Sequence, residues 1–114
     1  MEGNTASALQ AGLALIRRGE FFEAHEELET AWRAAPAGER DFYQGLVHVA
    51  VAWYQAGRGN RRGCERQLEK AARRLAPYAP RHCGVDVAGL LAQVRAAAEL
   101  VAGGSLDLPS LDLA

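Results

Sequence analysis

The sequence predicts an all-α protein, a single compact bundle of about five helices built from helical hairpins. Apolar residues recur at the spacing of amphipathic helices along almost the whole chain. Helix start and stop signals punctuate this pattern, and no stretch alternates apolar with polar residues as a half-buried strand would. The length of 114 residues is that of one domain. We therefore expect a helical domain over residues 1–102 and a short tail over 103–114, frayed or loosely docked.

The first two helices are bounded by small and turn-forming residues. Asn4 or Thr5 can cap the first helix, which we expect to stop near Gly19. The second helix is expected over residues 20–35, because the residue before Pro36 disfavours helical backbone.

Three more helices are predicted in the rest of the chain. The third, over 39–56, is long and largely apolar, so we expect it at the centre of the bundle. A glycine-rich turn over 57–60 leads into a fourth helix over 61–75. A loop bracketed by two prolines then passes through a His-Cys pair, and an aspartate caps a fifth helix over 86–101.

A faint internal repeat supports the hairpin architecture. The turn glycine and the small and apolar residues of the second helix are repeated at the fourth: Gly19, Ala24, Leu28 and Ala31 correspond to Gly59, Cys64, Leu68 and Ala71. The first copy is faintly tetratricopeptide-like. A solenoid needs about three repeats to be stable, so two copies favour a compact bundle.

Composition excludes several classes of protein. The net charge of −1 argues against a general binder of nucleic acids or membrane surfaces, and no segment approaches the roughly 20 apolar residues of a membrane span. The basic face of the fourth helix is interleaved with glutamates, as on a solvated surface. Cys64 and Cys83 have neither metal-like spacing nor disulfide density, and the His82-Cys83 pair is expected to be loop rather than nucleophile. We expect a reduced, cytoplasmic protein.

Glu29 is a charged residue at the edge of the apolar face of the second helix. On a helical wheel, His25 lies among Phe21, Leu28 and Trp32, and Glu29 falls only about 40° from it. A carboxylate at the edge of an apolar arc costs several kcal/mol unless it is paired, and His25 is one turn away.

Two interpretations of this pair follow. His25 and Glu29 can form a structural hydrogen-bonded pair, joined by an arginine from a neighbouring helix. Alternatively, their i and i+4 spacing directs two ligand atoms at one divalent metal ion, as in helical metal sites.

The third helix offers further ligands. If it pairs antiparallel with the second, His48 is level with His25, and Gln44 with Glu29. His25, Glu29 and His48 would then form a two-histidine-one-carboxylate set suited to zinc, iron or manganese. Without a metal, Arg40, Gln44 and Trp32 would bind a polar ligand beside Glu29. The alternative is that the polar residues of the third helix simply form its solvent face.

The core is expected to contain aromatic and aliphatic side chains of the second and third helices: Phe21, Leu28, Trp32, Leu46, Val49 and Trp53.

Three sequence blocks carry a family resemblance over about residues 15–90. They are H-x-x-x-E-x-x-W (His25, Glu29, Trp32), Q-G-L (Gln44, Gly45, Leu46) and G-N-x-x-G (Gly59, Asn60, Gly63). In this order they resemble the small bacterial and archaeal family called domain of unknown function 309. The resemblance implies an all-helical fold, no established activity, and metal binding through His25 and Glu29; it does not extend to His48.

Two functions stay open on the sequence. One is a metal- or polar-ligand-binding site built on His25 and Glu29, and water on such a metal would favour hydrolysis. The other is a non-catalytic interaction or dimerisation module in which the pair is structural, with a second copy or another protein as partner. No Ser-His-Asp order, P-loop or dinucleotide fingerprint is present, so the sequence names no reaction.

Overall fold

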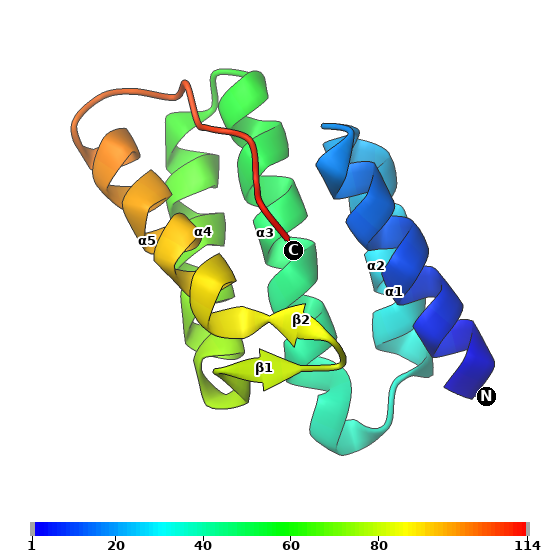
Figure 1. Cartoon of the computed structure of the whole chain (residues 1–114). Helices are drawn as coiled ribbons and strands as arrows, with labels where there is room; N and C mark the ends of the chain where they lie inside the picture. The colour runs from blue at the N-terminus through cyan, green and yellow to red at the C-terminus, as the bar shows by residue number, and fades with distance from the viewer. Residues whose placement is uncertain (1, 114) are drawn as a thin grey trace.

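Five α-helices form the computed structural model, which describes residues 2–113 and their side chains from residue 5, and they confirm the all-α prediction (Figure 1). They are α1 (Glu2–Arg17), α2 (Phe21–Ala34), α3 (Arg40–Gly57), α4 (Arg61–Leu75) and α5 (Val87–Ala102). Short 3-10 turns precede α3 (Ala37–Glu39) and follow α4 (Ala76–Tyr78). A two-stranded hairpin of β1 (Arg81–His82) and β2 (Val85–Asp86) leads into α5.

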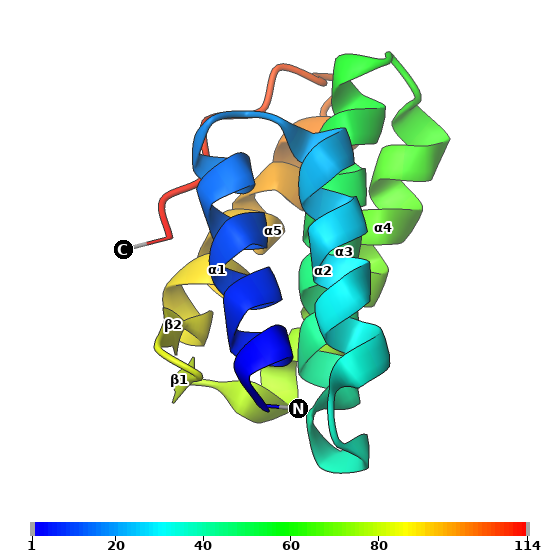
Figure 2. The ribbon, with the colours of Figure 1, turned by 90° about the vertical axis from the view of Figure 1, so that its right-hand side faces the viewer.

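The helices pack as consecutive antiparallel neighbours, with α3 in the middle. Figures 1 and 2 show α1 beside α2, α2 beside α3, α3 beside α4, and α5 against α4. Buried residues occur around most of α3, including Phe42, Leu46, Val49 and Trp53. A helix that packs against neighbours on both sides is apolar around most of its circumference. This explains why the apolar sequence of α3 predicted a central position.

Equivalent glycines make the turns of the two helical hairpins. Gly19 between α1 and α2 has φ +77°, and Gly59 between α3 and α4 has φ +76°, values that glycine adopts without steric cost. Gly12 lets the hairpin close, because a Cβ there would lie 2.6 Å from Leu28 Cγ. The internal repeat therefore corresponds to equivalent turns, while the tetratricopeptide likeness stays a prediction.

Most of the predicted core is buried. Leu28, Leu46 and Val49 are fully inaccessible and Trp53 is 5% exposed. Phe21 and Trp32 are only partly buried and pack against the edge of the core. We expected both to be core residues, but they lie on α2 at the boundary between the core and the solvent-exposed surface.

Two local predictions were wrong. Helix α1 begins at Glu2, so Asn4 and Thr5 lie inside its first turns and do not cap it. The hairpin of β1 and β2 was not predicted, because strands of two residues are too short to show alternation. The predicted cap of α5 is confirmed: the Asp86 carboxylate accepts a hydrogen bond from the backbone N–H of Gly89. Within residues 2–113, no helix is long and apolar enough to cross a membrane.

Candidate functional site

The predicted pair on α2 is brought together. His25 Nε2 lies 3.8 Å from Glu29 Oε1, with the two side chains 21% and 34% exposed. Arg33, one turn further along the same helix, approaches the same carboxylate oxygen to 3.7 Å. The arginine expected from a neighbouring helix thus comes from α2 itself.

The proton of His25 has a defined place. Its Nδ1 lies 2.5 Å from the backbone carbonyl oxygen of Phe22, so Nδ1–H donates and the neutral ring keeps a lone pair on Nε2. A metal-binding histidine characteristically donates its second ring N–H in this way. A small pocket of about 190 Å³ lies beside the ring, with Val51 and Tyr54 of α3 on its far side.

His48 is not brought to this pair. Its Nδ1 lies 2.7 Å from Gln67 Oε1 of α4, so the ring faces α4 rather than α2. At the level of His25, α3 instead presents Val51 and Tyr54, because the turn of α3 carries His48 round to its other side. Burial lowers the pKa of His48 despite the bond to Gln67, and nearby Arg74, Lys70 and Arg73 lower it further. This positive surrounding disfavours a bound cation.

Acidification should therefore destabilise the protein through His48. Since its pKa is lower in the folded than in the unfolded chain, the unfolded state binds the proton more readily below the ordinary histidine pKa of about 6.5. Stability is thus fully present above that pH and is lost as the pH falls towards the folded-state pKa. We expect His48→Gln to lose less unfolding free energy than the wild type between pH 7.5 and 5.5, measured by urea denaturation. An equal loss in both proteins would contradict the assignment.

Two of the three predicted ligand-binding residues meet across α2 and α3. The guanidinium carbon of Arg40 lies 5.0 Å from the ring centroid of Trp32, a cation–π contact. Gln44 is half-buried one turn before His48. A polar ligand held between Arg40 and Glu29 stays a prediction, and Arg40 already contacts Trp32.

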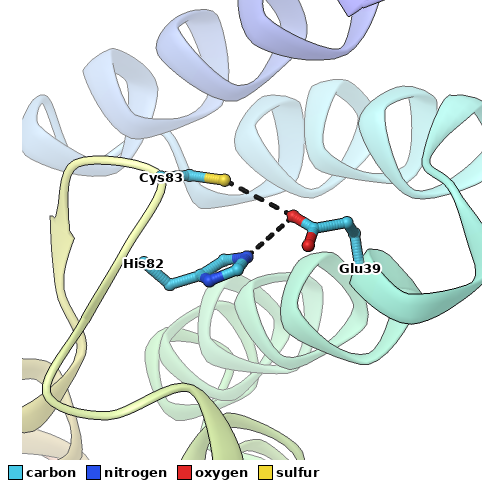
Figure 3. A group of neighbouring side chains, drawn as sticks. All are labelled: Glu39, His82 and Cys83. Carbon is cyan, nitrogen blue, oxygen red and sulfur yellow. Dashed lines mark hydrogen bonds and ion pairs between the residues drawn. The ribbon is translucent and has the colours of Figure 1, made fainter.

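A different trio converges elsewhere. Within the described residues, one group of three metal-ligating side chains has all its ligand atoms within 4.8 Å of one another: Glu39, His82 and Cys83 (Figure 3). Glu39 Oε1 lies 2.7 Å from His82 Nε2 and 3.6 Å from Cys83 Sγ. Both partners thus share a single carboxylate oxygen.

Each ligand has a local reason for its position. Glu39 ends the 3-10 turn before α3, and its side chain makes no capping hydrogen bond but contacts His82 instead. Neighbouring residues of a strand point to opposite faces. Cys83 lies just beyond β1 with φ +49°, and its thiol is directed to the same side as the imidazole (Figure 3).

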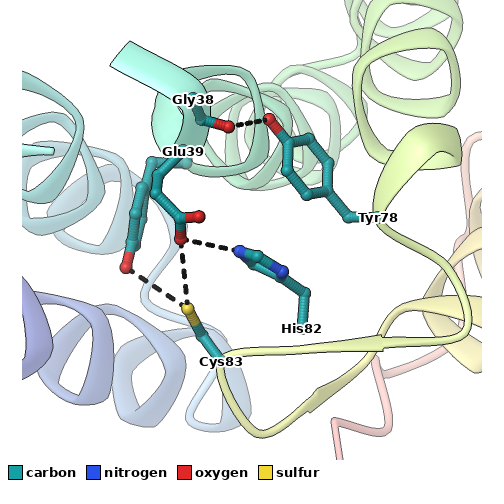
Figure 4. A network of polar contacts seen from close by, with 6 residues as sticks. Gly38, Glu39, Tyr78, His82 and Cys83 are labelled. Atoms are coloured by element: carbon teal, nitrogen blue, oxygen red, sulfur yellow. Dashed lines mark hydrogen bonds and ion pairs between the residues drawn. The ribbon is translucent and has the colours of Figure 1, made fainter. Parts of the chain in front are cut away.

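Aromatic rings hold the imidazole in place. The ring centroids of Phe42 and Tyr78 lie 4.7 Å and 4.8 Å from that of His82. The Tyr78 hydroxyl donates to the backbone carbonyl of Gly38 at 2.8 Å, which ties the segment before the hairpin to the start of α3 (Figure 4). The site therefore lies on a braced junction between the hairpin and α3.

The free thiol is not an activated nucleophile. Burial raises the pKa of Cys83, and the Glu39 carboxylate adds to the rise, although a bond to Tyr43 opposes it. Burial likewise raises the pKa of Tyr43, whose hydroxyl lies 3.7 Å from Cys83 Sγ, so the phenol stays neutral. In a thiol-based relay the imidazole stands between thiol and carboxylate. Here the Glu39 carboxylate lies between the thiol and the imidazole, so the three side chains do not form such a relay.

One of the three spacings already suits a tetrahedral metal, and a second would have to widen to do so. Zinc holds nitrogen and oxygen at about 2.0–2.2 Å and sulfur at about 2.3 Å, which separates tetrahedral ligand atoms by about 3.3–3.6 Å. The Glu39–Cys83 distance of 3.6 Å already matches this range. The hydrogen-bonded Glu39–His82 pair, at 2.7 Å, would widen by about 0.6 Å when a metal replaces the proton between them.

Two members of the trio, Glu39 and Cys83, border an open pocket. This open cleft has a volume of about 1090 Å³, and Glu39, Tyr43 and Cys83 line it together with residues of α1 and of the turn between α2 and α3. Leu9 and Pro36 are among its apolar residues. A group bound at Glu39 and Cys83 would thus face a space large enough for a small molecule.

Only part of this site has a signal in the sequence. His82 and Cys83 are adjacent residues of types that bind metals, but we expected them to be part of an ordinary loop, and this prediction overlooked the site. Glu39 is 43 positions from His82, and only tertiary packing brings α3 to the hairpin.

Comparison with known proteins places the chain in a family. No curated protein and no solved structure matches it. The family model described as domain of unknown function (DUF309) matches residues 9–67, more than half of the chain. This match runs from within α1 to within α4, and does not reach the hairpin with His82 and Cys83. The chain belongs to the DUF309 family.

Proposed function

We propose that the protein binds a divalent metal ion, zinc in preference to iron or manganese, through Glu39, His82 and Cys83. The observation that carries this proposal is the convergence of three different ligand types, from two distant parts of the chain, within 4.8 Å of one another. A thiolate together with an imidazole favours zinc over harder cations. The metal would be held where the hairpin meets α3.

The bound metal serves to hold a small ligand in the cleft. Three protein ligands leave the fourth tetrahedral position open, as in catalytic rather than structural zinc sites. Glu39 and Cys83 both line the cleft, so a molecule with an apolar body and a metal-ligating head, such as a carboxylate or thiol, would fit there. A water in the open position would be activated for hydrolysis.

Metal titration of the tag-free protein tests the proposal. We expect one equivalent of zinc, and a cobalt(II) complex with thiolate-to-metal absorption. Cys83→Ser should remove that absorption, and Cys83→Ser, His82→Ala and Glu39→Gln should each weaken zinc more than about 100-fold, beyond the effect of outer-shell changes. Cys64→Ala is the matched control, because Cys64 is buried between helices away from the trio. Stoichiometric zinc that is unaffected by Cys83→Ser would reject the site.

A second candidate is the pair predicted on α2, and the proton on His25 Nδ1 favours it. That proton leaves the Nε2 lone pair free near Glu29, where a metal or a polar ligand can bind with Trp32 and Arg40 nearby. The same titration decides between the two sites: loss of metal in His25→Ala and Glu29→Gln, with Cys83→Ser unaffected, would assign it to α2. Loss of stability alone in these two variants would leave a structural pair.

A further inference from the structure

The charged side chains of α4 are separated by sign in the folded protein. Glu65 and Glu69 line a pocket between α4 and α5 together with residues of α5. They pair with Arg61 and Arg73 at 3.6 Å and 4.0 Å. The glutamates that interleave with arginines along the sequence thus lie on the side of α4 that faces α5.

Three cations of α4 have no carboxylate partner. Within residues 5–113, the structure shows no ion pair for Arg62, Arg66 or Lys70. These residues follow one another at i, i+4 and i+8, so they form a single row, about 6 Å apart along the helix axis. We call Arg62, Arg66 and Lys70 the cationic row. Like charges at this spacing repel one another, so a bound anion would relieve a cost that the free protein carries.

The positive charge extends from the row to the junction of α4 with α3. Burial lowers the pKa of His48 on α3, and the charges of Arg74 and Lys70 lower it further. Asp41 offsets one of these charges through its ion pair with Arg74 at 2.7 Å. Lys70 has no such partner, so the potential along the row stays positive.

Aromatic rings lie beside one end of the row. Arg58, four residues before Arg62, lies 5.5 Å above the Tyr54 ring and donates to its hydroxyl at 3.0 Å. Phe22 of α2 is 46% exposed, and its ring lies 5.4 Å from that of Tyr54. Figure 2 shows the start of α2 at the same end of the bundle as the turn from α3 into α4. Tertiary packing thus brings aromatic side chains, which α4 itself lacks, close to its cations.

A row of cations next to exposed aromatic rings is the combination that binds single-stranded nucleic acids. The cations follow the phosphates of the backbone, and the bases stack on the rings. One strand of DNA carries a phosphate per about 3.4 Å of duplex axis, so the roughly 12 Å from Arg62 to Lys70 matches about three or four phosphates. The planar guanidinium of arginine also fits the oxygens of a phosphate. An acidic peptide would neutralise the same cations but gain little from Phe22.

We propose that the cationic row, together with Phe22 and Tyr54, binds a single-stranded nucleic acid. The row holds the phosphates, and the exposed ring of Phe22 stacks against a base. The net charge of −1 supplies no general attraction for a polyanion, so binding depends on this face. The proposal goes beyond the metal site and uses none of its residues.

The salt dependence of binding to the wild type is the first test. We expect fluorescence anisotropy to detect binding of a dye-labelled oligouridylate. Three phosphate contacts predict a slope of about −2 for the logarithm of the affinity against the logarithm of the salt concentration, or about a 20-fold loss between about 50 and 200 mM salt. Absence of binding at the lower concentration, or a slope near zero, would overturn the proposal.

Two triple variants locate the contacts. The first replaces the three residues of the cationic row with glutamine, and we expect it to lose the salt slope and about tenfold or more in affinity. The matched control removes the same charge from exposed arginines of α1, α2 and α5: Arg17→Gln, Arg33→Gln and Arg95→Gln. The control should keep the wild-type slope. Equal losses in the two variants, with helical circular dichroism retained, would show that the row is not the binding face.

Phe22→Ala tests the stacking contact separately from charge. Loss of one stacked base should weaken binding about fivefold or more while the salt slope stays at its wild-type value. Wild-type affinity in this variant would overturn the proposal. So would competition by polyglutamate or by phosphatidylserine vesicles that matches competition by unlabelled oligouridylate, because it would assign the face to an acidic protein or to a membrane.

Discussion

Phe42→Ala should lower the free energy of unfolding by about 3–5 kcal/mol, the cost of emptying an aromatic site in a packed core. Phe42 is fully buried in α3, and its ring packs against Tyr43, Tyr78 and His82 at centroid distances of 5.0, 5.5 and 4.7 Å. Urea denaturation followed by circular dichroism measures the loss. Zinc affinity should also fall, because the His82 ring loses one of its aromatic neighbours.

Phe22→Ala is the matched control for this change. Phe22 is the same residue type on α2, but it is 46% exposed, and its ring lies 4.9 Å and 5.4 Å from the rings of His25 and Tyr54. Its replacement leaves little cavity, so we expect a loss well below that of Phe42→Ala. Equal losses in the two variants would show that the core is not organised around α3.

The proposed site predicts that zinc stabilises the protein by about 2.7 kcal/mol at a free concentration 100 times its Kd, because an ion that binds only the folded chain shifts the equilibrium towards it. The gain should shrink at lower pH. Burial raises the pKa of Cys83, so at neutral pH the metal must displace the thiol proton. Each displaced proton costs a factor of ten in Kd per pH unit, or about 1.4 kcal/mol. Comparison of urea midpoints at pH 8 and pH 7, with and without zinc, measures both effects.

Cys83→Ser provides the control for this linkage. Without the thiolate, the variant should show no zinc-dependent gain at either pH. Its metal-free stability should stay close to that of the wild type, because the residue as a whole is exposed in the hairpin turn and only its thiol is partly covered by Tyr43 and Glu39. A gain that is unchanged in this variant, or that grows as the pH falls, would show that the ion binds elsewhere.

The helices were predictable because their signals are local. These signals are the apolar spacing, the glycine turns at 19 and 59, and the capping aspartate at 86. Each acts within a few residues, and the structure confirms the helices that they delimit. The start of α1 was wrong because a cap-type residue can equally lie within a helix. The hairpin of β1 and β2 was missed because it depends on a turn at Cys83 and Gly84 rather than on alternation.

The sequence does not predict in the same way which polar side chains contact one another across the fold. The pair His25 and Glu29 was predictable, since one turn of α2 fixes their distance. The position of His48 was not, because a rotation of α3 decides whether it meets α2 or Gln67 of α4.

The sequence by itself determined the five helices, their hairpin pairing, the central place of α3 and the family of the chain. Tertiary structure alone decided which distant groups meet: Glu39 with His82 and Cys83, and Trp53 and Gln93 with the tail. The physical reason is one of range. Helix periodicity and capping depend on residues a few positions apart, whereas a site assembled from positions 39 and 82 depends on how packed helices orient segments that share no local signal.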